Sequence, residues 1–467
     1  MYRILSLILV LGMGLTQSSI AAWPKSNEAL LPAPLPTASP ALQGPIHGPV
    51  EPVQAASATL PVDLKTAMEW TLERNPDLMA IRQNTRVSHA AWAVAQQFPT
   101  SLNPTVSLDV RPWTFDKNRG EGSRPLETQV SMSWAQPIEL GGRTGFRTEI
   151  ARAAFTQTQW NLVQAELAAL VQTYRLHQTA TYRREKWRVA QQLAEFNRQL
   201  VKTMERQMQA NQVATVDVVL AEVENQSSIQ QVEVSRQDYV GTLADLRQQI
   251  GIGEYMNCLE PVGLLQLPEE TLARDEDNLI RTALESRPEI QAARAQAVGS
   301  REAIGLARAD RIPIFSAGPV YEKNESGTTF YGLAVSTPVP VLNTGRTLVS
   351  QREAEYCRDL VILEQTQQKI RNQVKASLIK WHQTQQLVSR THATIEPIKE
   401  LAAKVDRLYA AGQSDLVKLL QVRQRLIQAE NTQLDAIWQA TQAYADVLTA
   451  LGTTPLIGAV GAASPTH

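Results

Sequence analysis

The side chains best suited to metal binding or catalysis, histidine and cysteine, are few in this sequence and widely spaced. There are 6 histidines and 2 cysteines among 467 residues. His382 and His392 would lie on different faces of a helix, so they lack the spacing of a metal-binding pair. If Cys357 lies on a long helix and Cys258 in a connector, they are too far apart to form a disulfide. The sequence therefore predicts no metal site and no cofactor.

Motifs for other chemistry are not recognisable in the sequence either. It contains no Ser-His-Asp order, phosphate-binding loop or paired catalytic carboxylates, so we expect that the protein is not an enzyme. The formal net charge of -1 and the pI of 6.6 give no electrostatic basis for binding nucleic acid. The function must therefore be sought in the elements that the chain builds.

The N-terminal segment predicts export from the cytoplasm. Arg3 precedes an apolar run from Ile4 to Leu15, which is shorter than a membrane span requires, so we interpret residues 1–22 as a signal peptide rather than an anchor. Small residues up to Ala22 leave the cleavage position open. Residues 23–62 are rich in proline and predict an extended linker, and no later segment is apolar for long enough to span a membrane as a helix.

A long helical hairpin dominates the first half of the chain. No proline occurs between Pro137 and Pro261, and residues 142–209 are rich in good helix formers. One unbroken helix of this length would measure roughly 100 Å. A polar turn at Asn211 and a second helical pattern from Asp217 to Gly251 complete a rod-like hairpin.

The chain repeats this organisation, which predicts a duplication. The segment Gln136–Thr144 is matched by Val339–Thr347, and the turn at Asn211-Gln212 is matched by Gly412-Gln413. The offset is roughly 200–212 residues throughout, as a duplication implies. We predict a first repeat at 63–255, a connector at 256–274, a second repeat at 275–452 and a tail at 453–467.

Each repeat contains a predicted β-hairpin, at about 104–135 and about 313–337. Polar and apolar residues alternate there, and aromatic residues such as Trp134 and Tyr321 lie near the ends. Alternation alone leaves two interpretations open: a membrane β-barrel or a small sheet on a soluble domain. Four strands are too few for a membrane barrel, which needs at least about eight, so a barrel would require several chains.

The motifs resemble those of the TolC-type outer-membrane efflux family over most of the chain, from Leu64 to about Leu451. The matching motifs are Asn75-Pro76-Asp77-Leu78, Gln136-Pro137-Ile138-Glu139-Leu140-Gly141-Gly142-Arg143, Arg287-Pro288-Glu289-Ile290 and Gly412-Gln413-Ser414-Asp415-Leu416. The resemblance implies a mainly α fold with a small membrane β part. Long helical hairpins would form an α-barrel tunnel, and four β-strands per chain would contribute to a trimeric twelve-stranded β-barrel.

The resemblance also implies a function and partners. It implies a homotrimer in outer-membrane lipid that conducts substrates passively from an inner-membrane pump of the resistance-nodulation-division type, through a periplasmic adaptor. The block Pro137–Arg143 is most similar to the heavy-metal branch, of the cobalt–zinc–cadmium kind. Drug efflux or type I secretion within the same family is the alternative, and a periplasmic coiled-coil scaffold is the alternative of another class.

Two groups of candidate functional residues follow from this resemblance. The barrel-to-helix joints would contain Pro137, Gly141, Gly142, Arg143, Pro340, Gly345 and Arg346. The periplasmic tip or gate would contain Asn211, Gln212, Asp217, Gly412, Gln413, Asp415, Lys418 and Gln421. Family members commonly carry aspartates at the tip of the second hairpin, where this chain has Lys418 and Gln421.

The charges at the tip allow two interpretations. Asp217 and Lys418 would form a salt-bridged gate, or both would be solvated turn charges. Asp415 is predicted to cap a helix, with Asp217 in the equivalent place of the first hairpin. His177 lies in an apolar seam and is interpreted as structural rather than metal-binding. Pro397 is expected to kink the second long helix or to interrupt its hydrogen bonds.

Overall fold

The computed structural model describes residues 60–112, 127–210, 213–253, 259–267 and 275–453. These residues belong to the unit Ser57–His467, one of two compact units of the chain. The predicted signal peptide and most of the predicted linker lie outside the described residues, as do Asn211, Gln212, Cys258 and nearly all of the tail.

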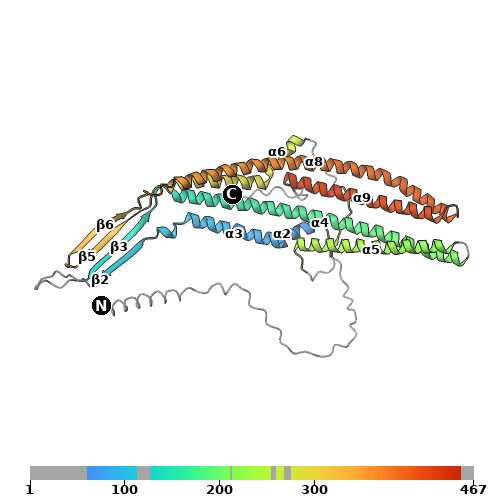
Figure 1. Cartoon of the computed structure of the whole chain (residues 1–467), viewed down its shortest axis with the longest axis horizontal. Coiled ribbons are helices and arrows are strands. Elements are labelled where there is room, and N and C mark those ends of the chain that lie inside the picture. The colour runs from blue at the N-terminus through green and yellow to red at the C-terminus, as the bar shows by residue number, and fades with distance from the viewer. Residues whose placement is uncertain (1–59, 113–126, 211–212, 254–258, 268–274, 454–467) are drawn as a thin grey trace, which may run out of the picture. The chain divides into compact units, whose positions relative to one another are not determined.

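Two series of elements follow one another in the same order, each with two short helices, a pair of strands and a pair of long helices (Figure 1). The first series is α2 (Leu64–Arg74), α3 (Pro76–Gln96), the 3-10 turn η1 (Thr100–Leu102), β2 (Thr105–Arg111), β3 (Gln129–Ile138), α4 (Arg143–Gln209) and α5 (Thr215–Ile250). The second is α6 (Glu276–Ser286), α7 (Pro288–Ala309), β5 (Phe315–Lys323), β6 (Thr329–Ser336), α8 (Arg346–Ala410) and α9 (Leu416–Leu451). The predicted fold class, mainly helical with four strands and long helical hairpins, is confirmed.

The short helices begin where the sequence supplies a cap. Asp63, the predicted N-cap of α2, accepts a hydrogen bond from the backbone N–H of Thr66 at 3.1 Å. Asn75 caps α3 in the same way, and Pro76 is the first residue of that helix. Proline is favourable at this position because its missing N–H would have no partner inside the helix. A proline also opens α7, but the residue before it, Arg287, makes no side-chain cap.

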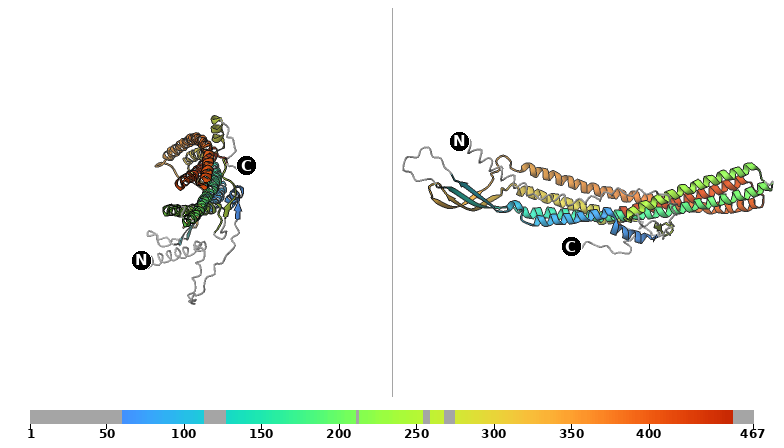
Figure 2. Two further views of the ribbon diagram at one scale, coloured as in Figure 1. Left: turned by 90° about the vertical axis from the view of Figure 1, so that its right-hand side faces the viewer. Right: turned by 90° about the horizontal axis from the view of Figure 1, so that it is seen from below.

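The long helices pack along one another because their apolar residues recur at three- and four-residue steps. Helix α4 has 67 residues and α8 has 65, and each folds back onto a 36-residue partner. Contacts between α4 and α9 join the two hairpins (Figure 2). A buried cluster of Leu167, Tyr174, Trp381 and Tyr444 occupies their middle. Val163, one turn before Leu167 on the same helix, is 39% exposed.

Helix α8 passes through Pro397 and continues to Ala410. The sequence predicted a kink or an interrupted hydrogen-bond ladder at this proline; the helix continues on both sides of it, and the kink stays a prediction. Proline removes one backbone hydrogen bond from the helix interior. Ile395 and Ala402, on either side of it, are buried, so tertiary packing offsets that loss.

A short sheet that the sequence did not predict holds the start of the described chain. Residues Leu60–Val62 form β1 and pair in parallel with β4 (Leu259–Pro261). The last residues of the predicted linker and part of the predicted connector are therefore ordered strands. Val62 and Leu259 are buried in a cluster with Leu246, which explains why these short segments are fixed. Strands of three residues give too little alternation to be recognised in a sequence.

Candidate functional site

The four longer strands form one antiparallel sheet in the order β2-β3-β5-β6. Each predicted hairpin pairs its own two strands, and β3 pairs with β5 to join the two repeats. The outer strands β2 and β6 are exposed along their whole lengths. Within the described ranges, each of them has one edge with no strand beside it. Such edges expose backbone groups that can pair with another chain.

One face of this sheet is apolar over most of its area. Because side chains alternate along a strand, the register assigns every second residue to this face. Its apolar members are Val106, Leu108, Val110, Val130, Met132, Trp134, Ile138, Phe315, Ala317, Pro319, Tyr321, Tyr331, Leu333 and Val335. The exposed fraction is 66% at Leu108 and 84% at Leu333. A contiguous apolar patch of this kind marks a surface that contacts lipid or protein.

The opposite face carries mostly small and polar side chains, with Val320 and Phe330 as its larger apolar members. Its members are Thr105, Ser107, Asp109, Arg111, Gln129, Ser131, Ser133, Ala135, Pro137, Ser316, Gly318, Val320, Glu322, Phe330, Gly332, Ala334 and Ser336. The hydroxyl oxygens of Ser107 and Ser133 lie 2.6 Å apart and share a hydrogen bond. Arg111 forms an ion pair with Asp109 at 3.0 Å. This face is suited to water.

The first predicted joint, between β3 and α4, contains Gly141 and Gly142 in left-handed backbone conformations, with φ of +82° and +72°. Residues with a Cβ rarely adopt this conformation, so glycine allows the chain to turn sharply out of the sheet. A Cβ on Gly141 would also lie only 3.1 Å from the side chain of Ile312. Pro137 lies one residue before the end of β3.

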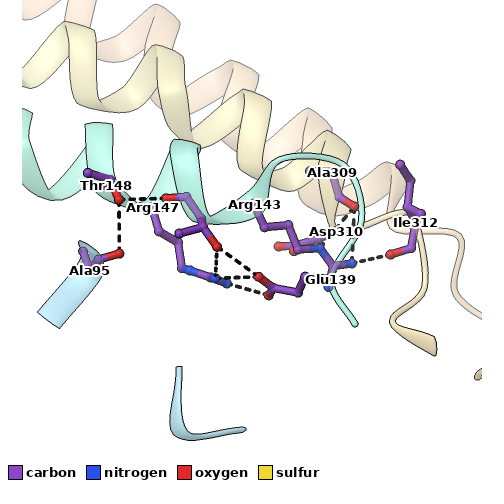
Figure 3. A network of polar contacts seen from close by, with 9 residues as sticks. Ala95, Glu139, Arg143, Arg147, Thr148, Ala309, Asp310 and Ile312 are labelled. Carbon is purple, nitrogen blue, oxygen red and sulfur yellow. Dashed lines mark hydrogen bonds and ion pairs between the residues drawn. The ribbon is translucent and has the colours of Figure 1, made fainter. Parts of the chain in front are cut away.

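Arg143, the first residue of α4, ties this joint to the end of α7 (Figure 3). Its side chain is only 7% exposed and forms an ion pair with Asp310 at 3.1 Å. Its guanidinium donates hydrogen bonds to the carbonyl oxygens of Ala309 and Ile312. Carbonyl groups at the C-terminus of a helix have no partner within the helix and attract a positive charge. The arginine therefore fixes the start of one helix against the end of another.

A second ion pair at this joint links the strand side to the helix side. The guanidinium of Arg147 donates to both carboxylate oxygens of Glu139, at 2.7 and 2.6 Å (Figure 3). The side chain of Glu139 is 11% exposed and that of Arg147 is 27% exposed. Hydrogen bonds from Arg147 hold the pKa of Glu139 below its ordinary value. A half-buried ion pair with two parallel hydrogen bonds makes this joint stiff.

The second joint has the same backbone form and a different environment. Gly345 has φ of +71° and precedes α8, and its N–H donates to the side chain of Asn343 at 2.9 Å. Pro340 and Arg346 are exposed, whereas Arg143 is buried. Leu342, at the position of Glu139 in the repeat, is 101% exposed. The two joints that the sequence treated as equivalent are therefore not equivalent within one chain.

The predicted tip residues lie at the opposite ends of the long helices, near the α4–α5 and α8–α9 turns. Gly412, Gln413 and Gln421 are exposed. Asp415 is the N-cap of α9, as predicted, because its carboxylate accepts the backbone N–H of Lys418 at 3.0 Å. The tip residues Asn211 and Gln212 lie outside the described residues.

Asp217 corresponds to Lys418, not to Asp415. Asp217 is the third residue of α5 and Lys418 the third residue of α9. This agrees with the repeat of the sequence, in which Asp217-Val218-Val219 matches Lys418-Leu419-Leu420. Ala214 takes the cap position in the first hairpin, so Asp217 does not occupy the place of Asp415. Asp217 is half-buried and Lys418 is exposed. In the described part of one chain, no ion pair joins these two residues.

His177 and Cys357, the histidine and cysteine considered in the sequence, lie in places that fit no metal site. The ring of His177 is buried, and its Nε2 donates to the carbonyl oxygen of Val62 at 3.3 Å. Burial lowers the pKa of His177. Cys357 is a free, exposed thiol. Among the described residues, no three His, Cys, Asp or Glu side chains gather as a metal site would require.

These features together define a class of protein. The sheet has one apolar face, one polar face and unpaired edges, and such strands are stable in a bilayer only when a closed barrel satisfies every edge. Within the described ranges, no helix has both the length and the hydropathy to cross a bilayer. The exposed apolar face makes the sheet the candidate membrane part, and the helical hairpins are attached to it through the two joints.

The chain belongs to the outer membrane efflux protein family, whose model matches residues 68–252 and 279–453. It is accordingly an outer-membrane protein that extends into the periplasm. A search of curated protein sequences gives no match.

Solved structures of outer-membrane channels have a similar fold. The CusC structure is 16% identical, covers 85% of this chain and 94% of its own, and has a TM-score of 0.69. The Campylobacter jejuni CmeC channel is 15% identical, covers 83% of this chain and 85% of its own, and also has a TM-score of 0.69. The open state of the Neisseria gonorrhoeae MtrE channel is 20% identical, covers 84% and 89%, and has a TM-score of 0.65.

Sequence reasoning missed the polar contacts that stiffen the first joint. Glu139 directly follows β3 and lies eight residues before Arg147, with a double-glycine turn between them. No helical spacing rule brings such residues together, because the turn alone sets their distance. The signal that could have found them is the acidic residue just before the glycines, with basic residues on the first turns of the following helix.

Proposed function

We propose that three copies of this chain form the outer-membrane channel of a tripartite efflux system. The observation that carries the proposal is the four-stranded sheet with one apolar face and two unpaired edges. Because every neighbouring pair in the sheet is antiparallel, β6 runs antiparallel to β2. Pairing β6 of one copy with β2 of the next continues the pattern, and three times four strands closes a barrel of twelve.

The helical part would then continue the barrel as a tunnel through the periplasm. Each chain supplies the four long helices α4, α5, α8 and α9. The expected partners are a periplasmic adaptor and an inner-membrane pump of the resistance-nodulation-division type, which bring the substrate to the tunnel. The channel itself conducts passively and carries out no reaction.

Metal cations are the substrate that we propose. The support is the resemblance of the block Pro137–Arg143 to the heavy-metal branch of the family. A strain without this gene should become more sensitive to cobalt, zinc or cadmium and be restored by the intact gene. Unchanged metal tolerance together with new sensitivity to organic drugs would replace this substrate with the alternative one.

We also propose that Asp217 and Lys418 close the tip by pairing between copies. Lysine in the first turn of a helix is disfavoured by the helix dipole, so a compensating carboxylate from a neighbouring copy would explain its position. Lys418→Ala should raise the ion conductance of the closed channel, and so should Asp217→Asn. The exchanged pair Asp217→Lys with Lys418→Asp should restore the wild-type current. Equal currents in wild type and all variants would refute the gate and favour the alternative, in which both residues are solvated turn charges.

The channel itself is tested with the purified mature protein. Heat-sensitive trimer bands, extraction only with membrane detergents and ion currents in planar bilayers are expected. A water-soluble, elongated monomer without currents would favour the periplasmic scaffold instead. The comparison is decisive because a scaffold has no use for the exposed apolar face of the sheet.

A further inference from the structure

The polar face of the sheet has few charges, and most of them cancel. Among the described strand residues on this face, only Asp109, Arg111 and Glu322 are charged at neutral pH. Asp109 is neutralised by its ion pair with Arg111 at 3.0 Å. Lys323, next to Glu322, points to the other face and pairs with Glu127 at 2.6 Å.

Among the described residues, Glu322 is the carboxylate on this face that forms no ion pair. Its hydrogen-bond partner is the neutral side chain of Gln129, whose Nε2 donates to Oε1 at 3.3 Å. The residues around it, Ser131 on β3 and Phe330 on β6, carry no charge either. A carboxylate with only neutral partners acts at full charge on ions in the adjoining water.

The register places this charge in a defined part of the sheet. Ser131 pairs with both Asp109 and Glu322, so the two carboxylates lie in one row across the strands. This row is near the strand ends farthest from the helices, since β3 enters the joint at Ile138. In a closed barrel whose apolar face meets lipid, the row becomes a ring around the lumen near its outer mouth.

We propose that Glu322 is a specificity-determining residue that makes the outer pore selective for cations. The proposal rests on the proposed channel function and concerns the chemistry of its lumen. Three copies would place three uncompensated carboxylates in one ring, and rings of acidic side chains are the usual basis of cation preference in wide pores. The ring concentrates cations and repels anions without binding either of them tightly.

The expected effect is modest and depends on salt. At about 0.1 M ionic strength the Debye length is about 10 Å, so a ring near the lumen wall is partly screened at the pore axis. Three partly screened charges enrich monovalent cations over anions by roughly two- to fourfold. The preference should grow as salt is lowered and should vanish near 1 M.

The experiment measures the reversal potential of purified trimers in planar bilayers under a potassium chloride gradient. Wild type should be cation-selective, E322Q should lose most of the preference, and the charge-conserving E322D should keep it. R111Q frees Asp109 from its ion pair, so it should raise the cation preference above wild type. The cation preference should therefore fall in E322Q and rise in R111Q, although each variant removes one charge from the same face.

Several outcomes would overturn the proposal. Currents from E322Q with the wild-type permeability ratio would show that the ring does not set selectivity. If E322Q does not assemble, a permeability ratio of R111Q at or below the wild-type value would be equally decisive. Absence of any current from wild-type protein would instead refute the proposed channel, and the selectivity ring with it.

Discussion

Gly318 should be the least replaceable residue of the sheet, and the substitution Gly318→Ala tests the strand pairing on which the channel depends. It lies in β5, where the backbone of β3 passes very close. A Cβ at this position would lie 1.8 Å from the carbonyl oxygen of Trp134 and 3.2 Å from the Cα of Ala135. Both contacts are with backbone, so no side-chain rotation relieves them.

The size of the effect follows from the shift that the methyl group requires. An ordinary contact begins near 3.4 Å, so the strands must separate locally by well over 1 Å. Such a separation breaks the hydrogen bonds on either side of Gly318, and each contributes about 0.5–1.5 kcal/mol. Two or three lost bonds amount to roughly 1–4 kcal/mol, a large part of the stability of an ordinary domain.

Gly332 on the neighbouring strand β6 is the matched control, because a Cβ there meets nothing within 4 Å. We expect Gly332→Ala to form heat-sensitive trimers in the outer membrane at wild-type levels, and Gly318→Ala to give few or none. Urea unfolding of the purified trimers measures the difference in stability. Equal assembly and equal unfolding midpoints for the two variants would refute the pairing of β3 with β5 at this point.

Three further predictions concern the helical part and its attachment. Glu139→Gln should lower stability by about 1–3 kcal/mol, because it leaves Arg147 half-satisfied in a mostly buried place; a double-mutant cycle with Arg147→Gln measures the coupling. The pKa of Glu139 is lower in the folded protein than in the unfolded chain. The stability that the ion pair contributes is therefore fully present above the unfolded pKa and is lost as pH falls through the folded pKa. Measurements of unfolding free energy between about pH 3 and 6 should show this loss. The pKa of His177 is also lowered in the fold, so the packing of β1 against it should weaken as pH falls below about 6.5. Hydrogen exchange at the Val62 backbone should then become faster at low pH. In His177→Gln the exchange rate should lose this pH dependence.

Much of the fold could be predicted because its signals are local. The long helices follow from proline-free stretches of good helix formers, and their starts follow from caps such as Asp63 and Asp415. The strands follow from alternation that continues for seven to ten residues. Repetition strengthened both signals, because the same order of elements recurred about 200 residues later.

The remaining features depend on contacts between distant residues. The sequence did not predict that β3 pairs with β5, although this pair joins the two repeats. Nor did it predict that α5 begins without a side-chain cap, whereas Asp415 caps α9. The role of Arg143 also needed the structure, since its partners Ala309 and Asp310 lie in the other repeat.

The difference between the two joints is itself an argument for assembly. The first joint is satisfied within one chain, where the buried Arg143 holds the end of α7 and Glu139 holds Arg147. The second joint leads out of the edge strand β6 and leaves Leu342 and Arg346 exposed. Duplicated halves with the same backbone would be expected to have similar surroundings in a complete molecule. Within one chain, the first joint packs against the end of a neighbouring helix, and the second joint has no such neighbour. In a closed ring, the next copy would supply that neighbour. It would also pair with the free edge of β6 beside this joint.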